Sequence, residues 1–262
     1  ALIGAGPDTR FIVPAANCRE AGLVHETHAL AAASLQQVID WLEGNDTLDL
    51  ATDEYGEGNR SGEPQPDFAE VKGQESAKRA LQVAAAGLHN VLLIGPPGGG
   101  KTMLARRMPS IMPDMTREEI LETTKIYSVA GLLTADHPLI AVRPFRAPHK
   151  NASTASIIGG GRVPRPGEIS LAQNGVLFLD EFTEFHRDVL EALRQPLEDK
   201  LVTIARAHAT CTYPANFSLV ASCNPCPCGF YGSDLECTCT PLQIQKYLGR
   251  ISGPLLDRMD LH

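Results

Sequence analysis

The chain has 262 residues, of which 43% are hydrophobic and 21% charged, and its formal net charge is −8. This length suits one large domain or a medium domain with a smaller piece, and the composition is that of a globular protein. No run of about 18 apolar residues occurs, so no membrane span or membrane partner is predicted, and the negative charge excludes a general binder of polyanions.

The start of the chain carries no visible targeting signal. Residues from Ala1 onward include neither a basic stretch nor an initiator Met, so we expect an internal fragment of a longer protein. Five of the seven Cys lie within residues 223–239. A secreted, disulfide-bonded domain spreads its Cys more evenly, so this cluster favours a reducing, cytoplasmic location.

The first 70 residues divide into two parts. Residues 10–14 form a short apolar strand pattern, and residues 17–24 suit a short helix. Ser34 is a candidate N-cap for a helix with apolar residues at helical spacing. Residues 1–42 are too few to bury a core alone, so we expect the tail of a domain. Residues 43–70 are acidic and interrupted by Gly and Pro, which indicates a solvated linker.

From residue 71 onward, strand and helix patterns alternate. Helices are predicted at residues 74–87, after residue 101 and at 189–197, and apolar strands at 90–94, 176–179 and 217–222. This alternation is typical of an α/β fold, a parallel sheet with helices on both faces. We therefore expect residues 71–262 to form one domain.

A phosphate-binding loop follows the first of these strands. Residues 95–102, GPPGGGKT, match the P-loop pattern between a strand and a helix. Glycines let backbone N–H groups curl around phosphate, and Lys101 would reach the β- and γ-phosphates of ATP. Thr102 would offer its hydroxyl to Mg²⁺. The nucleotide-binding residues predicted here are Gly95, Pro96, Pro97, Gly98, Gly99, Gly100, Lys101 and Thr102.

Two carboxylates follow the second strand. Asp180 and Glu181 come directly after residues 176–179, at the end of a strand where open parallel sheets bind ligands. Asp180 would hold Mg²⁺ and Glu181 would orient and polarise the attacking water. An ordinary exposed acidic turn is the alternative for this motif alone.

The third strand ends near Asn224. A polar side chain at this edge, between the two phosphate motifs, could hold the attacking water or sense the γ-phosphate. The alternative is an Asn that forms a turn before Pro225. The predicted sheet order favours the sensing role.

Longer motifs resemble those of one family. Residues 95–102, 176–181 and Asn224, in this order, are similar to a AAA+ module. The segments FRAPH, IGGGR, PRPGEISL, CNPCPCG and GPLLDRMDLH, at residues 145–149, 158–162, 164–171, 223–229 and 253–262, resemble the magnesium-chelatase-like AAA+ ATPases of the ComM/YifB family. One departure is Lys150, where the family usually has a second His after His149.

The resemblance carries further expectations. It implies a partial Lon-protease-like (ribosomal protein S5 domain 2-like) α+β piece at residues 1–42, an AAA+ core at 71–262, and a C-terminal lid after His262. It implies homo-oligomeric, hexameric rings that use ATP and Mg²⁺. Arg258 would act as an arginine finger toward the neighbouring subunit, where its charge would stabilise the transferring phosphoryl group. A surface Arg paired with Asp257 or Asp260 is the alternative. Residues expected at the adenine pocket are Val71, Gly73 and Gln74.

A basic stretch offers a DNA contact. Residues 159–167 form a Gly- and Pro-rich loop, expected to be mobile, in which Arg162 and Arg165 could bind backbone phosphate. In related proteins an insertion in this stretch faces the ring pore. Residues 200–206 alternate like one strand of a hairpin, with Lys200 near its tip. Plain surface bases are the alternative at each of these positions.

Four cysteines suggest a metal. Cys226, Cys228, Cys237 and Cys239 form two C-x-C pairs that could enclose a tetrahedral Zn²⁺. Cys223 and Cys226 also have the commoner C-x-x-C spacing, and reduced thiols in a loop are the alternative.

Two functions compete. The first is an ATP-driven DNA motor, a branch-migration helicase in natural transformation and recombination, as the family resemblance implies. The second is a chelatase-type motor that remodels a protein partner. The cysteine-rich stretch and the sequence of residues 162–168 favour the first function.

Overall fold

The structure is a computed structural model that describes residues 10–22, 29–51, 66–134, 138–161, 164–206 and 209–262. The chain separates into a smaller unit, Ala1–Gly62 with Leu132–Ala141, and a larger unit, Glu63–Gly131 with Val142–His262. Within the described ranges, none of the helices combines the length and the apolar character that crossing a bilayer requires.

The smaller unit is built on a three-stranded sheet. β1 (Phe11–Pro14) pairs in parallel with β2 (Ala29–Ala32), and α1 (Cys18–Gly22) follows β1. α2 (Leu35–Leu42) begins after Ser34, whose Oγ accepts a hydrogen bond from the Gln37 backbone N–H at 3.2 Å. The predicted strand at residues 10–14 and the N-cap are therefore confirmed.

The described ends of the acidic linker predicted at residues 43–70 contain short ordered elements. β3 (Asp49–Leu50) pairs antiparallel with β2, and Leu48 is buried beside it. At the other end, Phe68 is buried in a 3₁₀ turn, η3 (Phe68–Glu70), and belongs to the core of the larger unit. The charged residues around Leu48 and Phe68 obscured the apolar character of these two positions in the sequence. Residues 52–65 lie outside the described part.

The larger unit is built on a parallel sheet with the strand order β4, β11, β8, β5. These strands are β4 (Val91–Ile94), β11 (Ser218–Cys223), β8 (Val176–Leu179) and β5 (Phe145–Arg146). The three predicted strands are confirmed, whereas β5 went unnoticed because only two residues pair with β8. β11 lies between β4 and β8 and runs parallel to both. The C-terminal ends of these three strands therefore meet at one edge of the sheet.

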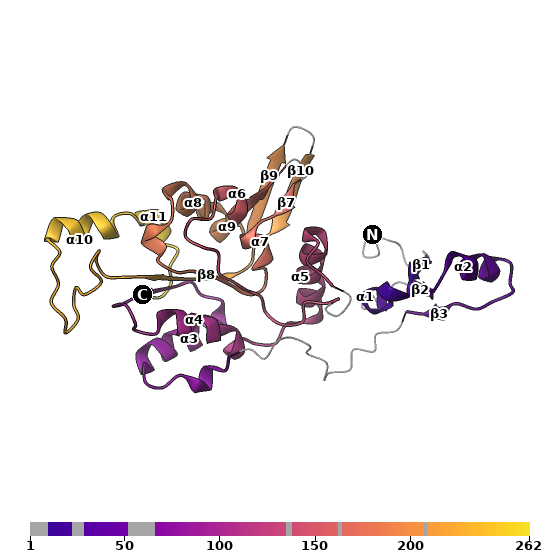
Figure 1. Cartoon of the computed structure of the whole chain (residues 1–262), viewed down its shortest axis with the longest axis horizontal. Coiled ribbons are helices and arrows are strands. Elements are labelled where there is room, and N and C mark those ends of the chain that lie inside the picture. Colours follow the sequence, from indigo (N-terminus) through magenta and orange to yellow (C-terminus); the bar gives the residue numbers. More distant parts are fainter. Residues whose placement is uncertain (1–9, 23–28, 52–65, 135–137, 162–163, 207–208) are drawn as a thin grey trace. The chain divides into compact units, whose positions relative to one another are not determined.

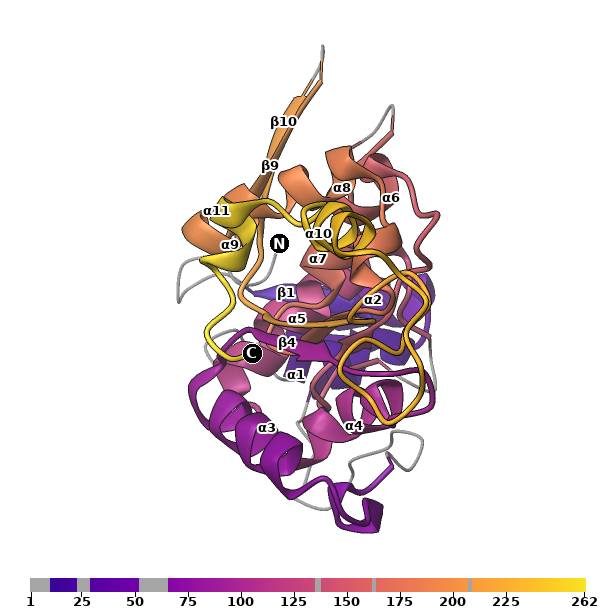
Figure 2. The same ribbon diagram turned by 90° about the vertical axis from the view of Figure 1, so that its left-hand side faces the viewer.

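Helices cover both faces of this sheet, as predicted (Figures 1 and 2). Because side chains alternate along a strand, Phe178 faces one core cluster while Leu177 and Leu179 face the other. The first face packs against α3 (Glu75–Gly87) and α4 (Lys101–Arg107), and the second against α6 (Thr154–Ile158), α7 (Glu168–Leu171), α8 (Arg187–Ala192) and α9 (Arg194–Asp199). The helix predicted at residues 189–197 is thus two short helices.

Two β-hairpins extend from the second face of the parallel sheet. β9 (Leu201–Arg206) and β10 (Ala209–Pro214) form the longer one, which projects beyond the helices (Figures 1 and 2). Lys200 lies at its base and not near its tip as predicted, because Lys200 ends α9 and its carbonyl oxygen accepts from the Ala215 N–H at 2.8 Å. β6 (Gly159–Gly160) and β7 (Arg165–Pro166) form the shorter hairpin.

The shorter hairpin fixes both ends of the basic loop that we expected to be mobile. A Cβ at Gly167 would lie 2.4 Å from the backbone nitrogen of Gly159, so the two strands approach closer than any other residue type allows. The loop is therefore anchored at each end, and Arg162 lies outside the described residues.

Gly175 offers a test of this fold. It precedes β8, and an added Cβ would lie 2.1 Å from the carbonyl oxygen of Pro144, which also accepts the Val176 N–H at 2.8 Å. We expect Gly175→Ala to lower the free energy of unfolding by about 1–3 kcal/mol or more through overpacking. Urea denaturation would measure the loss. Gly253→Ala, where a Cβ meets no atom within 4 Å, is the control, and equal midpoints for the two variants would contradict the packing described.

Candidate functional site

The P-loop occupies the turn between β4 and α4. Gly98 and Gly100 adopt left-handed conformations with φ of 76° and 80°, which favour Gly. A Cβ at Gly99 would lie only 3.2 Å from the carbonyl oxygen of Pro96. The loop can therefore close tightly, with the backbone N–H groups at the start of α4 available to an anion.

Lys101 joins the P-loop to the end of β11. Its Nζ donates to the carbonyl oxygens of Gly95 at 2.6 Å and Pro96 at 2.9 Å, and to Oδ1 of Asn224 at 3.3 Å. Partial burial lowers the pKa of Lys101, and the nearby Asp180 carboxylate opposes that effect. The predicted phosphate ligand and the predicted sensor thus lie in direct contact.

Asp180 is held by three donors at the end of β8. Thr102 Oγ1 donates to its Oδ2 at 2.8 Å, the Glu181 N–H donates to its Oδ1 at 3.0 Å, and the Ser222 hydroxyl donates to the same oxygen. A hydroxyl beside a carboxylate is a donor set that suits Mg²⁺. Sequence reasoning missed Ser222, although a polar side chain inside a fully buried strand requires a hydrogen-bonding partner.

Glu181 is exposed at the rim and has a left-handed backbone with φ of 52°. Its Oε2 accepts from Nζ of Lys150, and this hydrogen bond raises the pKa of Lys150. Neighbouring His149 accepts the Asn151 N–H at its Nδ1, at 3.2 Å. Lys150, the departure from the family pattern, therefore reaches the carboxylate predicted to activate water.

These groups line one cleft of about 390 Å³. Its lining comprises residues of the P-loop, the pair Asp180 and Glu181, and the end of β11 from Ser222 to Asn224. Residues 97–102, Asp180, Glu181 and Asn224 thus meet at one edge of the sheet, whereas Gly95 and Pro96, also predicted to bind nucleotide, line a neighbouring cavity. Arg258 does not line this cleft.

A second cavity of about 370 Å³ adjoins the P-loop on the side of α3. Gln74 and His262 line it, and Gln74 Nε2 donates to the Gly99 carbonyl oxygen at 3.2 Å. Val71 and Gly73, predicted at the adenine pocket, are absent from this lining. Val71 is 3% exposed and belongs to the core of the larger unit.

Arg258 lies near the chain's end and pairs with neither predicted aspartate. Its guanidinium donates to Glu198 of α9, and its backbone oxygen accepts from Asn90 Nδ2 at 2.8 Å. Asp260 instead accepts the Asn90 N–H at 2.7 Å. The side chain is 46% exposed, so it is accessible to a neighbouring molecule.

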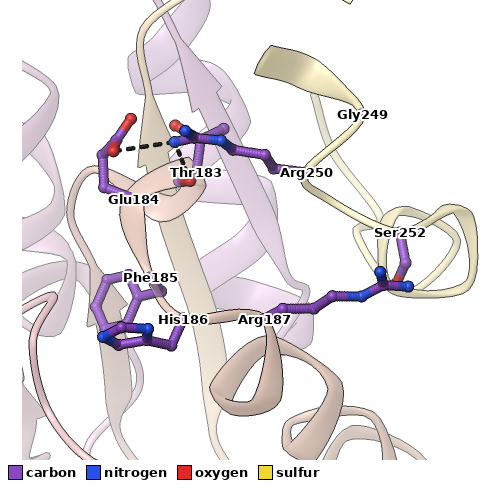
Figure 3. Close-up of a pocket in the computed structure, with 8 residues that line it drawn as sticks. All are labelled: Thr183, Glu184, Phe185, His186, Arg187, Gly249, Arg250 and Ser252. Carbon is purple, nitrogen blue, oxygen red and sulfur yellow. Dashed lines mark hydrogen bonds and ion pairs between the residues drawn. The ribbon is translucent and has the colours of Figure 1, made fainter. Parts of the chain in front are cut away.

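A third cavity, of about 560 Å³, lies between the turn after Glu181 and the segment that leads to Arg258 (Figure 3). Arg250 bridges its two sides, donating to the Thr183 carbonyl oxygen at 3.2 Å and to Glu184 Oε2 at 3.0 Å. In Figure 3, Arg187 extends toward Ser252 on the opposite wall. These contacts tie the segment carrying Arg258 to the segment carrying Glu181.

The structure describes most, but not all, of the residues predicted to bind DNA or a metal ion. Arg165 is exposed on β7, whereas Arg162 lies outside the described residues. Cys226, Cys228, Cys237 and Cys239 bring their Sγ atoms within 4.8 Å of one another. Cys223 is not in that group: it is buried in the core, and burial raises its pKa to about 11.

Comparisons with known proteins identify the family of the chain. Residues 67–262 match the family described as magnesium chelatase, subunit ChlI. The chain is 48% identical over 264 residues to Competence protein ComM of Haemophilus influenzae, covering 100% of this chain and 52% of that protein. It is 47% identical over 254 residues to the uncharacterized protein YifB of Escherichia coli, covering 96% and 49%. The chain therefore spans about half the length of these relatives.

A more distant relative carries the family's name. The chain is 25% identical over 182 residues to the chloroplastic magnesium-chelatase subunit ChlI of Oryza sativa, covering 60% of this chain and 44% of that protein.

Proposed function

This chain belongs to the magnesium chelatase subunit ChlI family, and from that membership we propose that its larger unit is the ATP-hydrolysing core of a ring-shaped motor that acts on DNA. Its task would be branch migration during natural transformation and recombination. The convergence of Lys101, Asp180, Glu181 and Asn224 on one cleft is the observation that carries the proposal.

Different residues would bind the phosphates of ATP and the accompanying Mg²⁺. The P-loop N–H groups and Lys101 would bind the ATP phosphates, in place of the carbonyl contacts that Lys101 makes in this structure. Thr102 and Asp180 would hold Mg²⁺, which when bound neutralises charge on the phosphate oxygens. Ser222 would keep the Asp180 carboxylate in position.

Three further residues would act on hydrolysis. Glu181 would orient water and accept its proton, and Asn224 would hold that water or sense the γ-phosphate. Arg258 would enter the cleft of the neighbouring subunit in a homo-oligomeric ring, for which we propose six subunits. Its exposure and its absence from its own chain's cleft support a role in trans.

DNA binding would be local, since the whole chain is acidic. Exposed Arg165 on β7, and Arg162 beside it in sequence, would contact backbone phosphates. The anchored ends of the β6–β7 hairpin support this assignment because a fixed loop can transmit motion to a bound strand.

Lys150 would lower the rate of ATP hydrolysis in the absence of DNA. An oxygen that accepts from an ammonium group is less available to take a proton from water, so removing Lys150 should release Glu181. We expect Lys150→Gln to raise ATP hydrolysis without DNA by about two- to fivefold, the range expected for an exposed ion pair. Steady-state turnover would measure it, beside Lys125→Gln on the exposed face of α5 (Arg117–Ala130). A loss of activity instead would assign Lys150 a positive role in positioning Glu181.

The alternative is a chelatase-type motor that remodels a protein partner, in keeping with the magnesium-chelatase name of the more distant relative. Measuring ATP turnover with and without branched DNA separates the two. The DNA motor predicts that branched DNA stimulates turnover and that Arg165→Ala weakens this stimulation. Turnover that depends on Glu181 but ignores DNA would favour the protein-remodelling alternative.

A further inference from the structure

Four cysteine thiols converge in the loop between β11 and α10 (Pro241–Leu248). The Sγ atoms of Cys226 and Cys228 lie 3.3 Å apart, and those of Cys237 lie 3.8 Å from Cys226 and 3.6 Å from Cys228. A tetrahedron with metal–sulfur bonds of about 2.3 Å has edges of about 3.8 Å. The spacing is therefore that of four ligands around one ion, and each measured distance is far longer than a disulfide bond.

The surroundings of the sulfurs suit thiolates bound to a metal. The backbone N–H of Cys228 donates to Cys239 Sγ at 3.4 Å, and the N–H of Tyr231 donates to Cys226 Sγ at the same distance. Such hydrogen bonds orient the sulfur atoms that coordinate a metal ion. The cluster includes no carboxylate and no imidazole. An all-sulfur, four-ligand set selects a soft ion such as Zn²⁺ over Mg²⁺ and leaves no open position for catalysis.

Side-chain burial does not account for the order of this loop. Between Asn224 and Thr240, Cys226 is the one buried side chain, while Tyr231 and Leu235 are 55% and 61% exposed. Figure 1 shows the loop as a long excursion beside α10. A segment without a core of its own requires another source of stability, and a bound metal ion can supply it.

The loop also touches the P-loop. Gly229 follows Cys228 with φ of +90°, and its N–H donates to the Cys226 carbonyl oxygen at 3.0 Å. A Cβ at Gly229 would lie 2.7 Å from Cδ of Pro97. The turn formed by the first cysteine pair therefore lies directly against the loop that would bind phosphate.

We propose that Cys226, Cys228, Cys237 and Cys239 bind one structural Zn²⁺, and that this ion holds the Gly229 turn against Pro97 and so keeps the P-loop ready for nucleotide. The zinc site stands independently of the proposed function. The effect on nucleotide binding rests on that function, because it takes the cleft beside Lys101 as the ATP site.

The first test is the metal content of the protein, purified without chelator and analysed by mass spectrometry for zinc. We expect about one zinc per chain, lost in the double variant Cys237→Ser with Cys239→Ser and retained in Cys211→Ser, on the separate β10 strand. Zinc-free wild-type protein would overturn the site. So would an intact mass lowered by the hydrogens that disulfide formation removes. This measurement on the wild type holds even when the double variant fails to fold.

The second test separates the effect on nucleotide from the metal. Gly229→Ala should keep its zinc, yet bind a fluorescent ATP analogue about tenfold more weakly, because the P-loop must shift away from the new methyl group. Gly232→Ala, which brings a similar positive-φ strain to the same loop (φ of +76°) but meets no atom within 4 Å, should match the wild type in both measurements. Unchanged affinity in Gly229→Ala would overturn the coupling and leave the zinc site standing. A wild type that binds zinc but no nucleotide would refute the proposed function instead.

Discussion

Replacing Glu181 with Gln is expected to lower kcat for ATP hydrolysis by about 10²- to 10⁴-fold, the usual contribution of a general base. The amide preserves the shape of the side chain but cannot take a proton from water. ATP should still bind, since the P-loop contacts and Asp180 are unchanged. Turnover and nucleotide affinity would be measured separately.

The control for this prediction is Glu118→Gln, which alters an exposed carboxylate at the start of α5, outside the residues that line the cleft. Its turnover should equal that of the wild type. If Glu181→Gln retained most of its activity, Glu181 would not be the base, and the exposed position of its side chain would be that of an ordinary acidic turn.

Replacing Arg258 with Ala is expected to lower kcat by about 10³- to 10⁵-fold, the contribution of an arginine finger. The pair with Glu198 is exposed on both sides, so its loss should affect stability little. Arg194→Ala is the matched control, because Arg194 pairs with Glu191 on the same surface at 3.1 Å.

Mixing two inactive variants shows whether Arg258 acts in trans. In a ring that contains both Glu181→Gln and Arg258→Ala subunits, some interfaces combine an intact Glu181 with an intact Arg258 from the neighbour. We expect turnover in the mixture to recover to a measurable fraction of the wild-type rate. Mixtures as inactive as each variant alone, with mixed rings formed, would indicate that Arg258 serves its own subunit or only its fold.

Local sequence patterns predicted the framework of the larger unit well. Apolar runs such as residues 176–179 reveal buried strands, and the P-loop supplies both a strand end and a helix start. β5 and the β6–β7 hairpin escaped prediction because two-residue strands have no periodicity to detect. Their positions depend on long-range contacts, such as the ion pair in which Arg146 Nε lies 2.6 Å from Glu168 Oε2.

The candidate site was predictable to the extent that its chemistry follows strand ends. Lys101, Asp180 and Asn224 each follow or adjoin a buried strand, and the sheet order brings them together. The pairing of Lys150 with Glu181 and of Arg258 with Glu198 joins distant segments on the surface, where no local pattern specifies a partner. Val71 lies in the core, because an apolar residue beside a nucleotide motif can equally well pack there.

The most direct test of the central claim is junction processing by the protein, with a labelled four-way DNA junction and ATP. The account predicts that the wild type converts the junction to separated duplexes only with hydrolysable ATP, that Glu181→Gln binds the junction without converting it, and that Arg165→Ala converts it more slowly. ATP turnover by the wild type without any junction conversion would contradict the DNA-motor function.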